Sequence, residues 1–152
     1  MEFEIGTQRY RWIENWLTLP NSDSGWAHHG LANLHEASVS DDHKVDGLST
    51  EGCLVTGHST RPELYFLDLN GRVLRQLHLP VSEIHHICPG KKQTLFICDI
   101  GSKDLSDQYA TEPQVIEFNL QGKTLRKLTK ATFGYGQHEL FKPTCTAMDH
   151  HS

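Results

Sequence analysis

A repeated segment constrains the fold of this chain more than any other feature. Residues 64–77 align without a gap on residues 115–128, which lie 51 positions further along the chain. Five of the 14 aligned positions are identical, and most of the others exchange one residue for a similar one. Each copy reads as an apolar run, then Asn-Gly or Gln-Gly, then an alternating run. This pattern is typical of a β-hairpin, because glycine supplies the positive φ of a tight turn and a period of two fits a strand.

Strand content and spacing then predict the fold class. A repeat of about 50 residues built from strands indicates a β-propeller, in which each repeat forms one blade of four antiparallel strands. We therefore expect an all-β chain with a first blade at 28–79 and a second blade at 84–129. Residues 10–19 form a further expected strand, and residues 141–152 read as the start of a third blade.

Two blades and flanking strands cannot close a ring, since propellers have about four to eight blades. We therefore expect an incomplete propeller that represents the N-terminal part of a longer protein, or a piece that associates with copies of itself. The strand at 10–19 would then complete the last blade of the ring. The expected core includes Leu31, Leu54, Phe96, Ile97 and Phe118.

The composition excludes several classes of partner. The chain has 152 residues, with 14 Lys and Arg against 19 Asp and Glu, and the basic residues stand mostly singly. Nucleic-acid binding would need a basic stripe, and no apolar run approaches the ~20 residues of a membrane span. Residues 1–5 lack the basic and apolar parts of a signal peptide. We expect no nucleic-acid or membrane partner and, by default, a cytoplasmic location.

Histidines recur at matching places in the two predicted blades. His28-His29 and His85-His86 are 57 residues apart, each at the start of a first strand, and the first strand of a blade lines the central channel. Neutral imidazole is a common zinc ligand, so the pairs could supply part of a metal site. They could equally hydrogen-bond to backbone carbonyls at the channel mouth. Asp99 follows a buried strand and is either a turn-capping carboxylate or a ligand facing the channel.

Three stretches carry a resemblance to a known family. Residues 10–16 with Leu19-Pro20 resemble the opening of the bacterial members, residues 66–74 resemble a blade hairpin, and residues 136–144 resemble the entry into the next blade. The chain resembles the six-bladed propellers built from NHL repeats, and among them the peptidyl-α-hydroxyglycine α-amidating lyase group. The resemblance runs from about residue 10 to the end of the chain.

The resemblance implies a function and a set of site residues. In that family a zinc ion held by three histidines cleaves a C–N bond of peptidyl-α-hydroxyglycine, giving a peptide amide and glyoxylate, and calcium sits in the channel. One zinc histidine stands in a Pro-His-Gly motif 14 residues before the Asp of a Thr-Asp pair. Here Ile84-His85-His86 and Cys98-Asp99 take those places, so the resemblance makes His85 a zinc ligand. His29 and Asp99 complete our list of metal candidates.

The family also places an arginine after the second strand of the first blade. The aligned residue here is Ser59, and Arg61, two positions later, is the candidate catalytic residue. The other zinc histidines and the catalytic tyrosine of the family would lie beyond Ser152. We therefore expect the chain alone to be inactive.

Three functions remain open at this point. The first is the zinc-dependent lyase, acting on a peptide or small-molecule ligand in the channel. The second is a non-catalytic NHL propeller that serves as a binding scaffold. The third is a hydrolase of the sugar-lactone type, which would need several acidic residues at a calcium centre.

Overall fold

The computed structural model describes residues 1–20, 30–34, 44–45, 48–49, 52–58, 61–91, 93–101 and 111–149. Within these ranges the chain is all β, with antiparallel strands and no α-helix. The expected all-β class is confirmed at this level.

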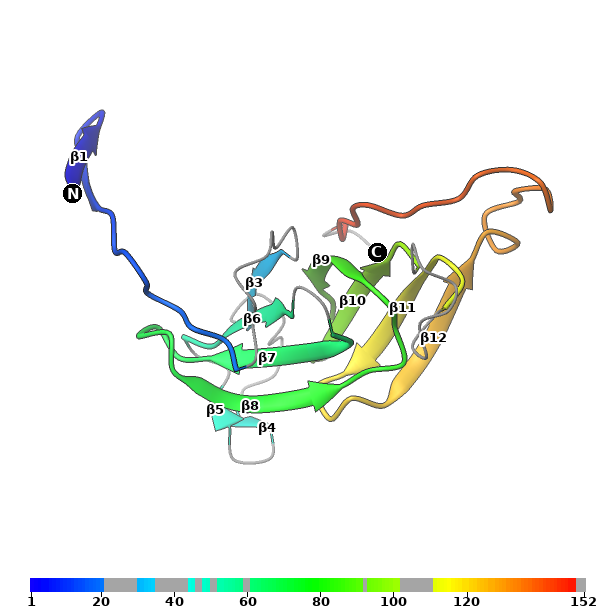
Figure 1. The fold of residues 1–152 in the computed structure, drawn as a ribbon, viewed down its shortest axis with the longest axis horizontal. Coiled ribbons are helices and arrows are strands. Elements are labelled where there is room, and N and C mark those ends of the chain that lie inside the picture. Colours follow the sequence, from blue (N-terminus) through cyan, green and yellow to red (C-terminus); the bar gives the residue numbers. More distant parts are fainter. Residues whose placement is uncertain are drawn as a thin grey trace.

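Two four-stranded antiparallel sheets form the body of the molecule (Figure 1). The first sheet has the order β3-β6-β7-β8, and the second has β9-β10-β11-β12. The strands of the first sheet are β3 (Leu31–Asn33), β6 (Leu54–Gly57), β7 (Glu63–Leu67) and β8 (Val73–His78). The strands of the second sheet are β9 (Ile84–Pro89), β10 (Thr94–Asp99), β11 (Gln114–Asn119) and β12 (Thr124–Thr129).

Two short hairpins accompany the sheets. One pairs β4 (Lys44–Val45) with β5 (Leu48–Ser49), between β3 and β6 in the chain. The other pairs β1 (Glu2–Ile5) with β2 (Gln8–Arg11), and every residue of these two strands is exposed. Figure 1 shows this N-terminal hairpin at the end of an extended arm, away from both sheets.

The two predicted hairpins have the same turn, bond for bond. Asp68 Oδ1 accepts hydrogen bonds from the backbone N–H groups of Asn70 at 2.8 Å and Arg72 at 2.9 Å. Asn119 Oδ1 accepts from Gln121 at 3.1 Å and Lys123 at 2.8 Å. Gly71 and Gly122 have φ values of 80° and 85°, which glycine adopts without the steric cost of a side chain. The two segments that repeat in the sequence therefore have the same backbone conformation at the turn.

The repeat extends to an irregularity after each turn. The register of β7 with β8 shifts between Phe66 and Leu67, which leaves Leu74 as an extra residue. The register of β11 with β12 shifts in the same way, and Leu125 is the extra residue. A β-bulge of this kind bends a strand and increases its twist.

The main core lies between the two sheets. Leu64 and Phe66 from β7 and Ile116 and Phe118 from β11 belong to one buried cluster. The strand β9 lies against β3 and β6, and the approach is close, since a Cβ on Gly57 would lie 2.9 Å from Ile84 Cγ2. Because buried apolar area is the main favourable term in folding, this interface holds the two sheets together.

Comparison of equivalent residues in the two repeats shows which face each sheet turns toward the other. Leu64 faces the core between the sheets, but its counterpart Val115 belongs to a second cluster on the far side of the second sheet. Conversely, Ile116 faces the shared core, and its counterpart Tyr65 is not part of it. The second sheet therefore repeats the orientation of the first instead of mirroring it. Its outward face, with Phe96, Cys98 and Val115, corresponds to the packed face of the first sheet.

Three expectations differ from the structure. The strand expected at 10–19 ends at Arg11, which is the last residue of β2 to pair with β1. Residues 12–20 pair with no strand. Of the third blade expected from 141–152, residues 141–149 form no strand, since a strand requires a hydrogen-bonded neighbour, and residues 150–152 lie outside the described residues. Leu31 is 58% exposed, because neighbouring residues alternate in direction and Ala32 takes the core position of β3.

Candidate functional site

His85 is the extra residue of a β-bulge. In the pairing of β9 with β10, Cys98 lies opposite His86 and Asp99 lies opposite Ile84, so His85 has no partner in the register. The bulge explains why Ile84 and Ile87, three residues apart, are both in the shared core. Bulges occur next to active sites, where they redirect a side chain, and His85 is the side chain redirected here.

A backbone carbonyl orients the His85 ring. His85 Nδ1 lies 2.9 Å from the carbonyl oxygen of Thr144. A carbonyl oxygen only accepts, so Nδ1 carries the proton and donates it. In the neutral ring the lone pair is then on Nε2. Metal-binding histidines are commonly held in this way, by a carbonyl bonded to the nitrogen that does not bind the metal.

His86 has the opposite arrangement. Its Nδ1 accepts a hydrogen bond from the backbone N–H of Thr146 at 3.3 Å, so the neutral ring is protonated at Nε2. That nitrogen lies 3.9 Å from Cys145 Sγ. The two adjacent histidines therefore hold residues 144–146 against the edge of the second sheet and differ in the ring nitrogen that remains unprotonated.

Asp99 lies in the interior, and both of its carboxylate oxygens accept hydrogen bonds from protein groups. The residue is fully buried. Its two carboxylate oxygens accept from five donors at 2.5 to 3.2 Å: the backbone N–H groups of Ser82, Glu83 and Gly101, the hydroxyl of Thr111 and the side-chain amide of Gln114. These contacts match the turn-capping alternative. They tie the β8–β9 connection to the ends of β10 and β11.

Arg61 lies at the same end of the sheets as His85, in the connection between β6 and β7. It is exposed, and its Nη1 lies 4.0 Å from Glu63 Oε1. Glu63 in turn accepts a hydrogen bond from the Tyr65 hydroxyl at 2.6 Å. Burial, with the Glu63 carboxylate beside it, raises the pKa of Tyr65 well above its usual value. His29, the remaining candidate, lies outside the described residues.

Among the described metal candidates, His85 alone is suited to bind zinc. His85 offers one oriented nitrogen, whereas a catalytic zinc site normally has three protein ligands. Across the described ranges, no three His, Cys, Asp or Glu side chains converge to hold a metal ion. Asp99 does not fit the ligand role, because five protein donors already surround its oxygens. His85 is therefore a suitable zinc ligand by itself, and no other described side chain converges with it to complete a metal site.

A groove with aromatic walls lies beside residues 144–146. It measures about 470 Å³ and is lined in part by Phe133, Tyr135, Phe141, Cys145 and Thr146. The ring of Phe141 lies 5.4 Å from each of the other two rings. Such rings give a ligand apolar contact area near His86.

The sequence reasoning missed the partners of the histidines. Thr144 and Thr146 lie 59 and 60 residues after His85 and His86, and no local pattern links them. A signal for the bulge was present, since two apolar residues flanking two histidines break the alternation of a regular strand.

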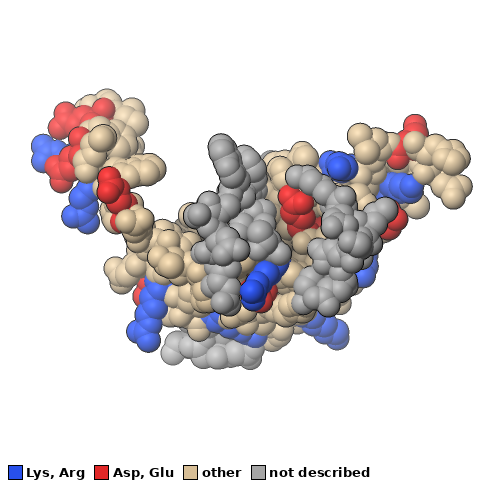
Figure 2. Space-filling view, viewed as in Figure 1, with Lys and Arg blue, Asp and Glu red and all other residues tan. Residues whose placement is uncertain are grey.

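Charged residues of both signs are spread over the visible face of the molecule. Figure 2 shows Lys and Arg spread singly along the visible face, with acidic and basic residues side by side on the N-terminal arm. On that arm, Arg9 pairs with Glu4 at 3.4 Å. None of the described residues lies in a helix with the length and apolar character needed to cross a membrane.

Comparisons with known proteins give little guidance. No family model matches the chain, and no curated protein matches it. Among solved structures, the chain is similar to a protein of unknown function from Bacteroides caccae, whose crystal structure was determined at 1.35 Å resolution. The two share 21% sequence identity with a TM-score of 0.46. The match covers 55% of this chain and 34% of that chain, so the chain spans about a third of the other protein. A similarity this weak gives no evidence about function.

Proposed function

We propose that the two sheets are the first two blades of an NHL-type, six-bladed propeller with zinc-dependent carbon–nitrogen lyase activity. Its substrate would be a peptidyl-α-hydroxyglycine, cleaved to a peptide amide and glyoxylate. The described residues include one suitable zinc ligand, His85, and no converging set of three, so the activity is proposed for the full-length protein. Calcium in the channel remains a prediction from the resemblance.

The geometry of His85 carries the proposal. The bulge turns its side chain out of the regular strand direction, and the Thr144 carbonyl leaves its Nε2 with a lone pair. His85 would therefore supply one zinc ligand at the end of the inner strands. Zinc bound there would supply Lewis-acid chemistry, polarising an oxygen of the substrate or lowering the pKa of a bound water.

The same-sense stacking of the sheets supports the ring. The first sheet packs the face of Leu64 against the second sheet, and the second sheet turns the equivalent face, with Val115, outward. Repetition of one such step around an axis gives a propeller. The aromatic groove near Cys145 offers apolar contact area to the body of a peptide substrate.

A non-catalytic binding scaffold is the second candidate. The observation that favours it concerns Asp99. Its carboxylate accepts hydrogen bonds from five protein donors in the surrounding loops, so its role is structural and it does not bind a metal ion. Arg61, exposed beside Glu63, has no described contact with His85. In a scaffold, the same inner-strand end would bind a ligand without reaction.

The test uses the full-length protein. Zinc content and glyoxylate release from a peptidyl-α-hydroxyglycine are measured for the wild type, His85→Ala and His86→Ala. The proposal predicts loss of both zinc and activity in His85→Ala, and retention of zinc in His86→Ala. A folded, zinc-loaded wild type that releases no glyoxylate would favour the scaffold.

A further inference from the structure

An exposed cysteine, Cys145, lies beside a fully buried one, Cys98. In the sheet, Cys98 has two direct neighbours, His86 on β9 and Val115 on β11. Residues that lie opposite each other in an antiparallel pair share a face of the sheet. Cys145 reaches both neighbours, because its Sγ lies 3.9 Å from His86 Nε2 and it lines the aromatic groove together with Val115. The Cys98 side chain therefore lies between the two places that Cys145 contacts.

The segment 141–149 crosses the outward face of the second sheet over Cys98. The backbone N–H of Thr146 donates to His86 Nδ1 at 3.3 Å, and Thr146 also lies close enough to the Cys98 thiol to lower its pKa through a hydrogen bond. Further along, Met148 packs against the buried cluster of this face. The segment pairs with no strand, so side-chain contacts and a few single hydrogen bonds hold it in place.

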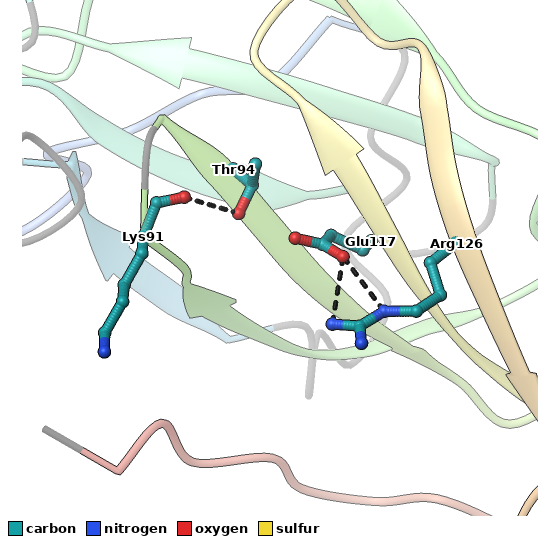
Figure 3. Close-up of polar contacts among 4 residues, drawn as sticks. All are labelled: Lys91, Thr94, Glu117 and Arg126. Atoms are coloured by element: carbon teal, nitrogen blue, oxygen red, sulfur yellow. Dashed lines mark hydrogen bonds and ion pairs between the residues drawn. The ribbon is translucent and has the colours of Figure 1, made fainter. Parts of the chain in front are cut away.

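Other side chains fill the part of this face around Phe96. The guanidinium of Arg126 lies 5.5 Å from the centre of the Phe96 ring, and its Nε and Nη2 each lie 3.1 Å from Glu117 Oε2 (Figure 3). Met148 lines one groove with these three side chains. Cys88, the direct neighbour of Phe96 in the sheet, lies at this end of the face. The third cysteine of the second sheet is therefore the less suitable partner for Cys145.

We propose that Cys145 is a site of reversible oxidation by peroxides and that it forms a disulfide bond with Cys98. The groove beside Cys145 gives a small oxidant access to its sulfur from solvent, whereas Cys98 is covered. A disulfide needs the two Cα atoms within about 4.4–6.8 Å. No strand pairing opposes a shift of the segment 141–149 toward this distance.

The reaction proceeds in two balanced steps. The Cys145 thiolate attacks one oxygen of hydrogen peroxide, the O–O bond breaks, and hydroxide leaves and takes up the proton of the original thiol as water. This step makes Cys145 a sulfenic acid. The Cys98 sulfur then attacks the Cys145 sulfur, the S–S bond forms and the S–O bond breaks, and the hydroxyl leaves with the Cys98 proton as a second water. Two thiols are oxidised by two electrons, and one peroxide is reduced to two waters.

The bond would act on the His85 ring through one residue. Cys145 directly follows Thr144, whose carbonyl oxygen accepts the hydrogen bond from His85 Nδ1. A disulfide at Cys145 would hold that carbonyl in place and with it the orientation of the ring. This consequence rests on the proposed function, but the disulfide itself does not, since it forms without metal or substrate.

Hydrogen peroxide added to the whole chain, with no metal present, tests the proposal. Trypsin releases the four cysteines in separate peptides, because Lys or Arg stands between each neighbouring pair. Mass spectrometry without reduction then identifies the linked pair. We expect a link between Cys98 and Cys145, a fall in free thiols from four to two, and recovery of the thiols with dithiothreitol. A non-reducing gel establishes that the link lies within one chain.

Two variants on the same face serve as a matched pair. Cys98→Ala should abolish the link, and Cys88→Ala should leave it intact, while far-UV circular dichroism establishes that each keeps its sheets. The wild-type peptide map decides the question even if a variant does not fold. A link from Cys145 to Cys88 would overturn the proposal. So would a Cys145 that stays a thiol, or one that is oxidised to the sulfinic acid while Cys98 remains a free thiol.

Discussion

Asp68 and Asn119 occupy equivalent places in the two hairpins, and each accepts the backbone N–H groups of the residues two and four positions later. A carboxylate oxygen and an amide oxygen thus serve the same turn. Both residues are acceptors at a place where the backbone donors would otherwise bond to water.

The first prediction concerns this exchange. Asp68→Asn should change the free energy of unfolding by less than about 0.5 kcal/mol, because the amide oxygen replaces the carboxylate oxygen as acceptor. Asp68→Ala should cost about 1 kcal/mol, since both N–H groups lose their partner. Urea denaturation measures both variants. A cost for Asp68→Asn equal to that of Asp68→Ala would show that charge, not the acceptor, stabilises the turn.

The second prediction concerns Asp99. Asp99→Asn should destabilise the chain by about 2–4 kcal/mol, because one oxygen becomes a donor facing other donors in a buried site. The comparison with Asp68→Asn makes the test specific, since both are the same chemical change. If Asp99→Asn and Asp68→Asn lower the free energy of unfolding by the same amount, Asp99 does not hold the loops around it together.

The third prediction concerns the turn glycines. Gly71→Ala and Gly122→Ala both place a side chain at positive φ, which costs about 1–2 kcal/mol. Gly71→Ala should in addition displace Trp16, whose carbonyl oxygen occupies the position of the new methyl group. Tryptophan fluorescence should shift to longer wavelength in Gly71→Ala and remain unchanged in Gly122→Ala. Identical spectra for the two variants would remove Trp16 from the turn.

The fourth prediction concerns the thiols and pH. Burial raises the pKa of Cys53 and of Cys98 from 9.0 to about 11. For Cys98 the neighbouring Cys145 and Cys88 add to the effect, and a hydrogen bond with Thr146 opposes it. In the unfolded chain both thiols lose their protons near pH 9, so the folded state binds more protons above that pH.

Stability should therefore be constant with respect to these groups below pH 9 and fall between pH 9 and 11. Urea denaturation at a series of pH values measures the slope. Cys53→Ala should reduce the slope strongly, and Cys145→Ala should reduce it only slightly, because exposed Cys145 adds a lesser effect to the burial that raises the pKa of Cys98. A slope that does not respond to Cys53→Ala would contradict the assignment.

The repeat predicted the hairpins down to their turn glycines, because a positive φ and an alternating pattern are local properties that the sequence carries directly. The position of Leu31 could not be predicted in the same way, since a one-residue difference in register exchanges the two faces of a strand. The contact of His85 with Thr144 depends on how distant segments meet. The turn-capping role of Asp99 was among the open alternatives, and its five donors come from three separate segments that no local pattern connects.

The protonation of the His85 ring tests the central claim most directly, because the proposed ligand role depends on the lone pair at Nε2. Long-range nitrogen–proton NMR of the histidine rings, on the whole chain at neutral pH, distinguishes the two neutral forms. The structure predicts His85 protonated at Nδ1 and His86 protonated at Nε2. A His85 ring protonated at Nε2 would contradict the account, since that nitrogen could then not bind a metal ion.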